Sequence, residues 1–282
     1  MRILFCGVRG STPAPGAEFV RVGGHTSCIA LAHGGETWTL ALDAGTGIRR
    51  ITAHLDGRAF VGSLLLTHLH WDHVQGLPFF AAGDRDDARV RVYMPDQTEP
   101  DGRTRVPADV LARAMSPPHF PIGPDELRGD WTFEQVKPGT HRIEDFDVVA
   151  FEVPHKGGRT FGYRISDGGT SLAYIPDHLP DAALTPAIAR ECAGVDLLVH
   201  DSQFLESERA VADLFGHATV DDAIELAARC GARRLALFHH APARSDDDVD
   251  AIADSAFARG GTEGVEVFVA REEQVLEFAG AG

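Results

Sequence analysis

The sequence has few cysteines and no long hydrophobic run. Its four cysteines, Cys6, Cys28, Cys192 and Cys230, lie far apart and form no Cys-x-x-Cys pair, which argues against a disulfide framework or a zinc ribbon and favours buried free thiols. No apolar run approaches the roughly 20 residues that span a bilayer, and the apolar start of the chain is too short for a secretory signal. We therefore expect a cytoplasmic protein without a membrane partner.

Positive charge is also scarce. The chain has 26 Lys and Arg residues against 42 Asp and Glu residues, a formal net charge of −16. An acidic surface repels polyanions, whereas binding to nucleic acid through counterion release requires a basic one. We therefore expect a nucleic acid to be an unlikely partner and a small molecule to be the substrate. Hydrophobic content of 44% and charged content of 24% are ordinary for a folded protein and exclude general disorder.

Internal repeats and low-complexity tracts are absent as well, so one continuous domain over residues 1–282 is the simplest organisation. Short apolar runs predict strands, and stretches that open with Thr or Ser before acidic residues predict helices. The predicted strands are 2–6, 28–33, 37–43, 61–67, 146–153, 160–165, 171–175, 195–200, 233–239 and 265–269, and the predicted helices are 47–55, 219–230 and 245–259. Two sheets packed face to face with helices outside would cover their apolar faces.

The middle segment, residues 81–130, is rich in Pro, Gly and charged residues. It contains a predicted strand at 89–94 and a predicted helix at 107–115. We interpret the segment as an insertion that lies over a site and shapes the substrate pocket. A surface connection without that role is the alternative, because long loops are often only connectors.

Histidine, by contrast, is abundant, with 14 residues, and it is densest in the Thr-His-Leu-His-Trp-Asp-His stretch 67–73. Three imidazoles and a carboxylate at a strand end cannot all be buried without partners, because their desolvation is costly. A metal ion would satisfy them together. His68 and His70 can point to one side of an extended backbone, whereas Asp72 and His73 lie one step further and can reach a second ion. Histidine and carboxylate without cysteine suit zinc, manganese or ferrous iron.

Residues 68–73 resemble the H-x-H-x-D-H signature of the metallo-β-lactamase superfamily. The motifs GVRGSTPAPG, GGHTSC, LDAGTGIRR, VPHKGGRTFGYRI, SLAYIPDH, LLVHDSQF, GHAT and LALFHH follow the order seen in its ribonuclease Z-like and cyclic-phosphate phosphodiesterase branch. The resemblance spans nearly the whole chain. It implies an α/β fold, namely an αββα sandwich of two mixed β-sheets flanked by helices, with a two-metal site at one edge.

The resemblance also implies a set of metal ligands. Those of the first metal would be His68, His70 and His155, those of the second Asp72, His73 and His239, with His240 as the fallback for the last, and Asp177 would bridge both ions. The implied cofactors are two divalent ions, zinc first, with manganese or ferrous iron as alternatives.

Further residues have implied or open roles. Asp43 would orient a ligand histidine. His217 in GHAT would stabilise charge near the scissile phosphate or protonate the leaving oxygen, and a place before a capped helix is its structural alternative. His200 and Asp201 have no assigned role, and neither has His25, which replaces the asparagine common in relatives. The chain also lacks a Gly/Pro-rich arm like the one with which ribonuclease Z grips tRNA.

From these points we expect a dinuclear-metal hydrolase that cleaves a small cyclic or activated phosphodiester, such as a cyclic nucleotide or a phosphoribosyl cyclic phosphate. Two ions about 3.5–4 Å apart would hold the attacking hydroxide, while Asp72 would hold its proton and His217 would assist the leaving group. The alternatives are a ribonuclease Z-like tRNA 3′ endoribonuclease and a lactone, thioester or β-lactam hydrolase. A homodimer, frequent among relatives, stays open.

Overall fold

The computed structural model describes residues 1–97 and 102–278, and its first seven-stranded sheet comes mainly from the N-terminal half. The strands are β1 (Arg2–Gly7), β2 (Cys28–Ala32), β3 (Leu40–Leu42), β4 (Val61–Leu65), β5 (Arg89–Pro95), β6 (Asp130–Val136) and β14 (Val275–Glu277). Their order is β14-β1-β2-β3-β4-β5-β6. Neighbours from β14 to β3 pair antiparallel and those from β3 to β6 pair parallel.

The second seven-stranded sheet repeats this plan. Its strands are β7 (Gly139–Ile143), β8 (Phe146–Glu152), β9 (Phe161–Asp167), β10 (Thr170–Ile175), β11 (Leu197–Asp201), β12 (Arg234–Phe238) and β13 (Glu266–Val269). In the order β13-β12-β11-β10-β9-β8-β7, β7 to β10 form an antiparallel meander and β10 to β13 run parallel.

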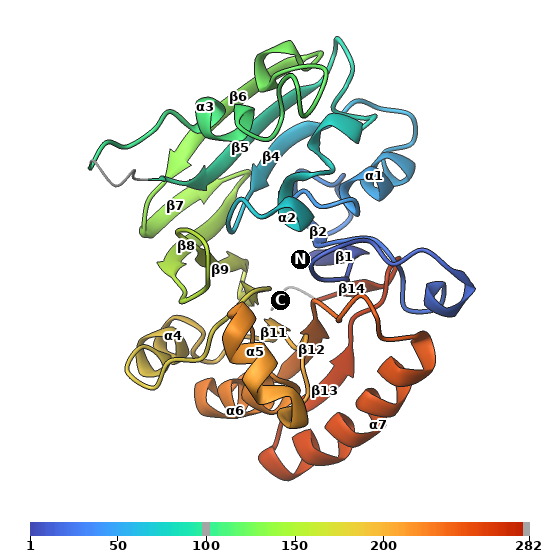
Figure 1. Cartoon of the computed structure of the whole chain (residues 1–282), viewed down its shortest axis with the longest axis vertical. Helices are drawn as coiled ribbons and strands as arrows, with labels where there is room; N and C mark the ends of the chain where they lie inside the picture. Colours follow the sequence, from blue (N-terminus) through green and yellow to red (C-terminus); the bar gives the residue numbers. More distant parts are fainter. Residues whose placement is uncertain (98–101, 279–282) are drawn as a thin grey trace.

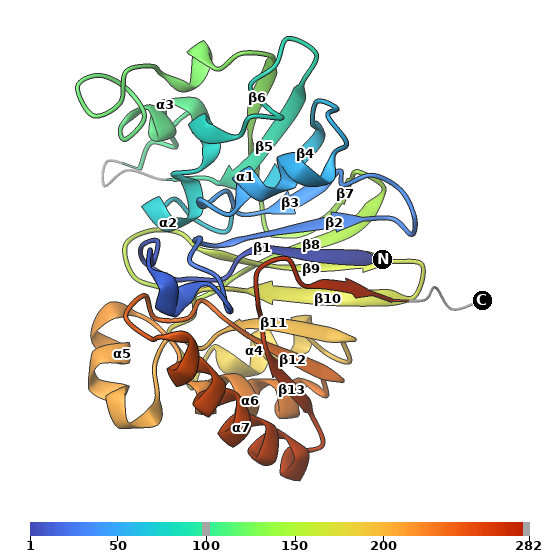
Figure 2. The same cartoon turned by 90° about the vertical axis from the view of Figure 1, so that its right-hand side faces the viewer.

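Helices cover the outer faces of both sheets. They are α1 (Ile48–Ile51), α2 (Trp71–Val74), α3 (Pro107–Ala112), α4 (Thr185–Glu191), α5 (Arg209–Phe215), α6 (Val220–Cys230) and α7 (Asp246–Glu263), with short 3-10 turns η1 (Ala17–Phe19), η2 (Thr52–His54), η3 (Leu77–Phe79), η4 (Pro124–Glu126) and η5 (Glu206–Glu208). Figures 1 and 2 show α1 to α3 on the side of the first sheet and α4 to α7 on the side of the second. The predicted αββα sandwich is therefore confirmed.

Burial explains the strand sequences. The central strands β2 and β10 are apolar or small throughout and buried at every residue, because both of their faces are covered. The edge strand β6 alternates exposed and half-buried residues instead. Large rings such as Phe5, Phe146 and Tyr163 have no exposed surface between the sheets. This core fixes the two sheets relative to each other and so fixes the ends of their strands.

The strand ends define the place of the site. β4 in the first sheet and β10, β11 and β12 in the second are followed by polar residues, and Figure 2 shows α2 and α5 at the same end of the molecule. Carboxyl ends of parallel strands meet at one edge of a sheet, where loops are free to carry function.

The segment 81–130 contributes both to the sheet and to the region above it. β5 pairs with β4 and β6 inside the first sheet, while α3 and η4 lie outside the sheet. Residues 98–101 of this segment lie outside the described part of the chain.

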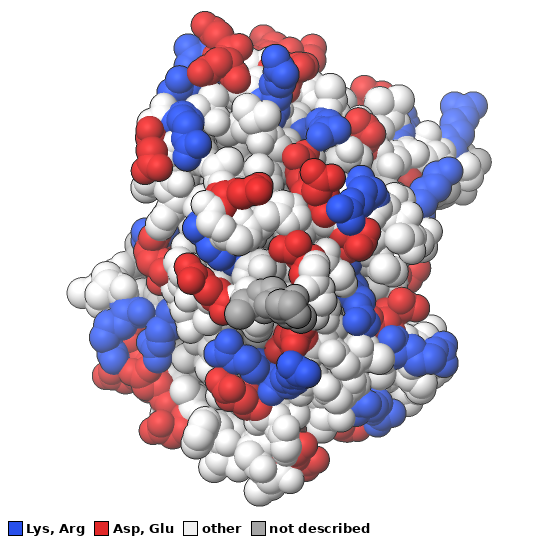
Figure 3. Space-filling model, turned by 180° about the vertical axis from the view of Figure 1, so that it is seen from behind, with Lys and Arg blue, Asp and Glu red and all other residues white. Residues whose placement is uncertain are grey.

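The helices and the surface bear on the expectations about membranes and charge. In the parts of the chain that the structure describes, no helix is both long and apolar enough to cross a bilayer. Acidic and basic side chains are interspersed on the face shown in Figure 3, without a large patch of one sign. The shortage of positive charge is thus not offset by a basic patch on that face.

Candidate metal centre

Seven candidate ligands converge from both sheets. The loop after β4 and the first turn of α2 supply four of them, and the loops after β8, β10 and β12 supply one each. The members of this group are His68, His70, Asp72, His73, His155, Asp177 and His239. Residues up to 171 positions apart in the sequence, from His68 to His239, therefore share one site.

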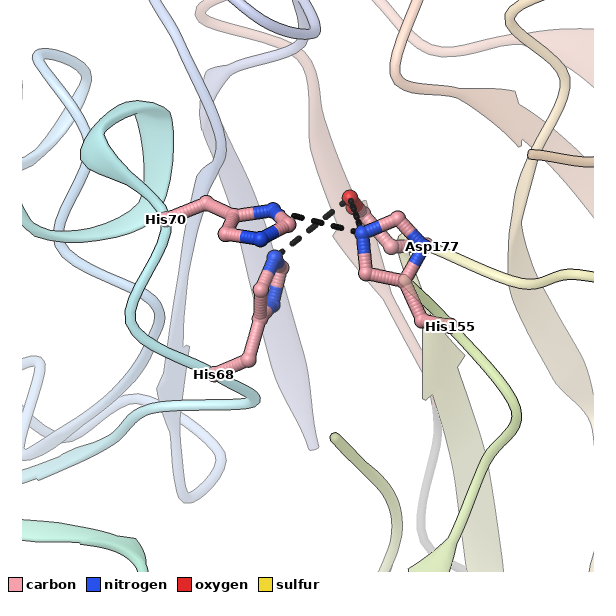
Figure 4. A group of neighbouring side chains, drawn as sticks. All are labelled: His68, His70, His155 and Asp177. Carbon is pink, nitrogen blue, oxygen red and sulfur yellow. Dashed lines mark hydrogen bonds and ion pairs between the residues drawn. The ribbon is translucent and has the colours of Figure 1, made fainter. Parts of the chain in front are cut away.

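The first donor set consists of His68, His70, His155 and Asp177, whose ligand atoms all lie within 4.8 Å of one another. Figure 4 shows the three imidazoles and the carboxylate turned toward a common point. Asp177 Oδ2 lies 3.5 Å from His68 Nε2 and 3.3 Å from His155 Nε2, and His70 Nδ1 lies 3.3 Å from His155 Nε2. This spacing leaves room for a cation among the donors.

The second donor set uses the other oxygen of the same carboxylate. Asp177 Oδ1 lies 3.1 Å from His73 Nε2 and 3.2 Å from His239 Nε2. Asp72 Oδ2 lies 3.3 Å and 3.1 Å from the same two nitrogens. Asp177 thus directs one oxygen at each set, which is the arrangement that a bridging ligand requires.

Orphaned buried atoms show that these residues suit metal ions. His68 Nε2, His73 Nε2 and Asp177 Oδ1 are buried and have no hydrogen-bond partner. Leaving such atoms unpaired costs free energy, and divalent cations held among them would remove that cost. The donor set contains imidazole nitrogen and carboxylate oxygen but no thiolate, a set that zinc, manganese and ferrous iron accept.

Asp43 fixes the ring orientation of two candidate ligands. Its Oδ2 accepts a 2.8 Å hydrogen bond from His73 Nδ1, so the lone pair of His73 faces the cluster. Thr67 Oγ1 donates to Asp43, and it therefore accepts from His68 Nδ1 at 3.0 Å. Tyr174 donates a further hydrogen bond to Asp43 Oδ2 at 3.0 Å. Asp43 itself has a φ of 59°, a strained value that the hydrogen bonds from His73, Thr67 and Tyr174 hold in place.

Burial and neighbouring charges shift the pKa values of His68 and His73 in opposite directions. Burial, with help from the neighbouring His73, lowers the pKa of His68 well below its usual range. Burial also opposes the charged form of His73, but Asp177, Asp72 and Asp43 outweigh it and raise the pKa of His73 well above normal. In the absence of metal, a proton on His73 thus replaces part of the positive charge that three carboxylates demand.

His217 lies beside the two donor sets and is paired with Asp201. Its ring is 5.2 Å from that of His239, centroid to centroid, and its Nδ1 donates a 2.9 Å hydrogen bond to Asp201 Oδ2. Burial alone would lower the pKa of His217, but Asp201 outweighs burial and raises it to about 9. The imidazolium at neutral pH is a poor ligand, although His217, Asp177 and His239 are close enough to form a third donor group. In the metal-free site His217 therefore carries a proton at neutral pH.

Three histidines whose roles were open lie outside the cluster. His240 Nε2 donates to the carbonyl oxygen of Ala270 at 3.1 Å, so the structure brings His239 rather than His240 to the cluster. His200 contacts His178 and the backbone of Asp201. His25 Nδ1 lies 3.2 Å from Thr46 Oγ1 in the loop after β3.

Three residues that support the site were not predicted from the sequence. Thr67 and Tyr174 hold Asp43, as described above, and the backbone N–H of Ser11 donates to Asp72 Oδ2 at 2.6 Å. Thr67 could have been found, since it directly precedes His68 at a strand end. Tyr174 lies within an apolar strand and Ser11 within a polar loop, and neither carries a local signal.

Several of the candidate ligands line a cavity of about 740 Å³. Its walls include His70, Asp72, His155, Asp177 and His217 together with Ser11, Gln203, Leu69, Trp71, Phe204, Val211 and Phe215. The size is in the range of small-molecule sites, and the cavity gives a substrate direct access to both donor sets.

Comparison with known proteins identifies the family. Residues 39–240 match the beta-lactamase superfamily domain. Ribonuclease Z of Natronomonas pharaonis is 24% identical over 99% of this chain and 98% of that protein, and ribonuclease Z of Gemmatimonas aurantiaca is 27% identical over 84% and 89%.

Solved structures show the same fold. Human tRNase Z, short form, superposes with a TM-score of 0.68 at 20% identity, covering 99% of this chain and 100% of that one. Zn²⁺-bound PqqB from Methylobacterium extorquens also has a TM-score of 0.68, at 21% identity, covering 99% and 100%.

These relatives overturn one expectation. The net charge of −16 led to the prediction that a nucleic acid is an unlikely partner, and that prediction is wrong, because relatives that match over nearly the whole chain are named as ribonucleases. The physical reason is that net charge is a sum over the molecule, whereas a substrate contacts a local surface, to which bound divalent cations add positive charge. The chain is a metal-dependent hydrolase that belongs to the metallo-β-lactamase superfamily, in its ribonuclease Z-like branch.

Proposed function

We propose that this chain is an endoribonuclease that hydrolyses a phosphodiester bond of RNA, with the 3′ end of a tRNA precursor as the substrate to test first. The observation that supports it most is the two-set donor cluster with His217 beside it, in a chain whose relatives over almost its full length are called ribonuclease Z. Human tRNase Z, whose name gives tRNA as its substrate, has the same fold.

Two divalent ions, zinc in the first instance, would be held by the two donor sets with Asp177 between them. When bound, they supply Lewis-acid polarisation of the phosphoryl group and lower the pKa of a water molecule. Two ions rather than one are proposed because Asp177 directs a separate oxygen at each set.

The side chains around the cluster have distinct roles in the proposed reaction. Asp201 engages Nδ1 of His217, so the proton on Nε2 is the one that can pass to the leaving oxygen of a substrate in the cavity. Asp72 stays ionised, because His73 and His239 hold its pKa well below the usual range against the effect of burial. Its carboxylate can orient the attacking water by accepting a hydrogen bond.

A small cyclic phosphodiester was the first expectation from the sequence. That preference depended partly on the net charge, and the relatives named ribonuclease Z support the ribonuclease alternative better. Cyclic nucleotides are therefore the comparison substrates rather than the proposed ones.

The substrate proposal is tested with the zinc-loaded protein. We expect cleavage of a tRNA precursor transcript at one position near its 3′ end, with a rate that falls as salt increases, and little turnover of cyclic nucleotides, a thioester or nitrocefin. Metal content is measured on the same sample, with two ions per chain expected. Efficient hydrolysis of a cyclic nucleotide beside an intact transcript would contradict the proposal.

The role of His217 is tested by His217→Ala. Loss of a general acid lowers kcat by about 10²–10⁴-fold, and the metal content should stay at two ions because neither donor set includes this residue. His141→Ala is the matched control, since His141 lies on β7 and bonds the Lys137 carbonyl. A variant with full turnover would exclude His217 as the proton donor.

A further inference from the structure

Trp71 is an exposed aromatic residue at the first position of α2, directly between two candidate ligands in the sequence. Asp72 and His73, which follow it, are buried, whereas the Trp71 side chain is 71% exposed. Most of the indole surface is apolar, and exposed aromatic surface at a site commonly marks a binding function. The proposed roles of the metal donors and of His217 do not explain why a tryptophan is exposed at this position.

A second cavity adjoins the metal cavity at this indole. It has a volume of about 530 Å³ and shares Leu69 and Trp71 with the metal cavity. Phe79 of η3 and Phe120 form an edge-on aromatic pair in its wall, with ring centroids 5.8 Å apart at 88°. Phe79 is itself 57% exposed.

The far wall of this second cavity comes from the segment 81–130. Val110 and Leu111 of α3 and Met115 after it provide apolar surface, and Arg113 and His119 add polar groups. Gln75 at the end of α2 adds another. The cavity therefore combines aromatic and apolar surface with a few polar groups, a combination typical of small-molecule sites.

We propose that this second cavity is a nucleobase subsite, in which the base of a nucleotide next to the scissile phosphate stacks on Trp71 and enters between α2 and the segment around Phe120. The inference rests on the proposed ribonuclease function and deepens it. Trp71 adjoins His70 and Asp72 in the chain, so a phosphate at the metal cluster places the neighbouring base within reach of the indole.

The lining of the second cavity also favours stacking as the way to hold a base. Arg113 is the one residue with a permanent positive charge among those that line it. Stacking on aromatic rings needs no basic residues and accepts every base, since each base has a π-face. Trp71 and the Phe79–Phe120 pair thus supply a contact that does not depend on salt.

The test combines protein and RNA changes in a cycle. Trp71→Ala should raise KM for the transcript about tenfold, the order of effect expected from losing one base–aromatic stack, with kcat nearly unchanged, and Trp71→Phe should restore most of the loss. For the wild type, a transcript with an abasic ribose beside the scissile bond should have a KM that is higher by a similar factor. Trp71→Ala should then add no further loss, because both changes remove the same contact.

The matched control is Phe257→Ala, which removes an aromatic side chain on α7 that is 66% exposed and lies in neither cavity wall. It should leave KM unchanged. If Trp71→Ala impairs the abasic and normal transcripts by the same factor, or impairs neither, the subsite is excluded while the ribonuclease function stands.

A binding measurement separates the two proposals. In the zinc-loaded protein, adenosine monophosphate should bind about tenfold more tightly than ribose 5-phosphate, which carries the phosphate without a base, and Trp71→Ala should abolish the difference. If the nucleotide binds more tightly but no RNA is cleaved, the nucleobase subsite is supported and the proposed ribonuclease function is contradicted. Equal binding of the two ligands would overturn the subsite.

Discussion

Asp201 connects several parts of the site through one carboxylate. It accepts hydrogen bonds from the backbone N–H groups of His178, Gln203 and Ala218 and from His217 Nδ1. A buried carboxylate with this many hydrogen bonds stays ionised. Burial by itself would raise the pKa of Asp201, but the pairing with His217 outweighs burial and lowers that pKa below the usual value. The protonation of His217 therefore depends on Asp201.

This dependence gives a titration prediction for the metal-free protein. The pKa of His217, about 9, lies above the unfolded value of about 6.5. The protonated pair therefore stabilises the fold fully below pH 6.5, by on the order of 3 kcal/mol, and this contribution is lost as the pH rises through 9. Histidine ring NMR on chelator-treated protein gives the pKa, and urea unfolding at pH 6 and pH 10 gives the stability.

Asp201→Asn provides the comparison for this titration. The amide keeps the shape but loses the charge, so burial should bring the pKa of His217 to its ordinary value or below. An unchanged pKa in the variant, or a wild-type titration near 6.5, would show that Asp201 does not control the proton of His217.

At the scale of elements, the position of α2 depends on close contact with the loop after β3. The N–H of Ala44 donates to the His73 carbonyl at 2.8 Å, and the N–H of Gly76 donates to the Ala44 carbonyl at 2.9 Å. A Cβ on Gly45 would overlap the backbone oxygen of Asp72. Only glycine at this position lets the loop and the ligand-bearing helix come together.

Gly45→Ala should therefore displace α2 and its two candidate ligands. We expect zinc affinity to fall at least tenfold and the free energy of unfolding to drop by about 1–3 kcal/mol, as overpacking does. Gly35→Ala is the control, because a Cβ there meets nothing within 4 Å. Competition with a zinc chelator and thermal unfolding measure the two effects, and native zinc affinity in Gly45→Ala would contradict the packing argument.

Elements with clear apolar periodicity were predicted well. The eleven predicted strands correspond to β1, β2, β3, β4, β5, β8, β9, β10, β11, β12 and β13, and the four predicted helices to α1 with η2, α3, α6 and α7. The elements that were not predicted are β6, β7, β14, α2, α4 and α5. β6 and β7 are mostly exposed edge strands, so hydrogen bonds to a neighbouring strand rather than an apolar pattern define them.

For the whole molecule, the metal cluster joins the two sheets. His68, His70, Asp72 and His73 follow a strand of the first sheet, and the remaining candidate ligands, His155, Asp177 and His239, follow strands of the second. Ions bound between them would act as cross-links that only the folded state provides, so metal binding should stabilise the entire sandwich.

Metal removal should therefore lower the melting temperature. Zinc at 1,000 times its dissociation constant adds about 4 kcal/mol, which corresponds to a shift on the order of 10 °C for a domain of this size. Asp177→Asn should lose most of the shift, since it faces both donor sets, whereas His141→Ala should keep it. Calorimetry with zinc and with chelator measures the shift, and equal melting temperatures in the two conditions would rule out a structural cross-link.

The sequence by itself determined what depends on local patterns. The strand-forming runs and the order of the motifs indicated the fold, and the 67–73 stretch with those motifs identified the residues that the structure brings together. The tertiary structure decided what depends on orientation and on distant contacts. It chose His239 over His240, because consecutive side chains point to different sides and His239 adopts a φ of 59° toward the cluster. It also gave Asp201 its partner and opened the cavity beside Trp71, since packing between segments far apart in the chain creates both.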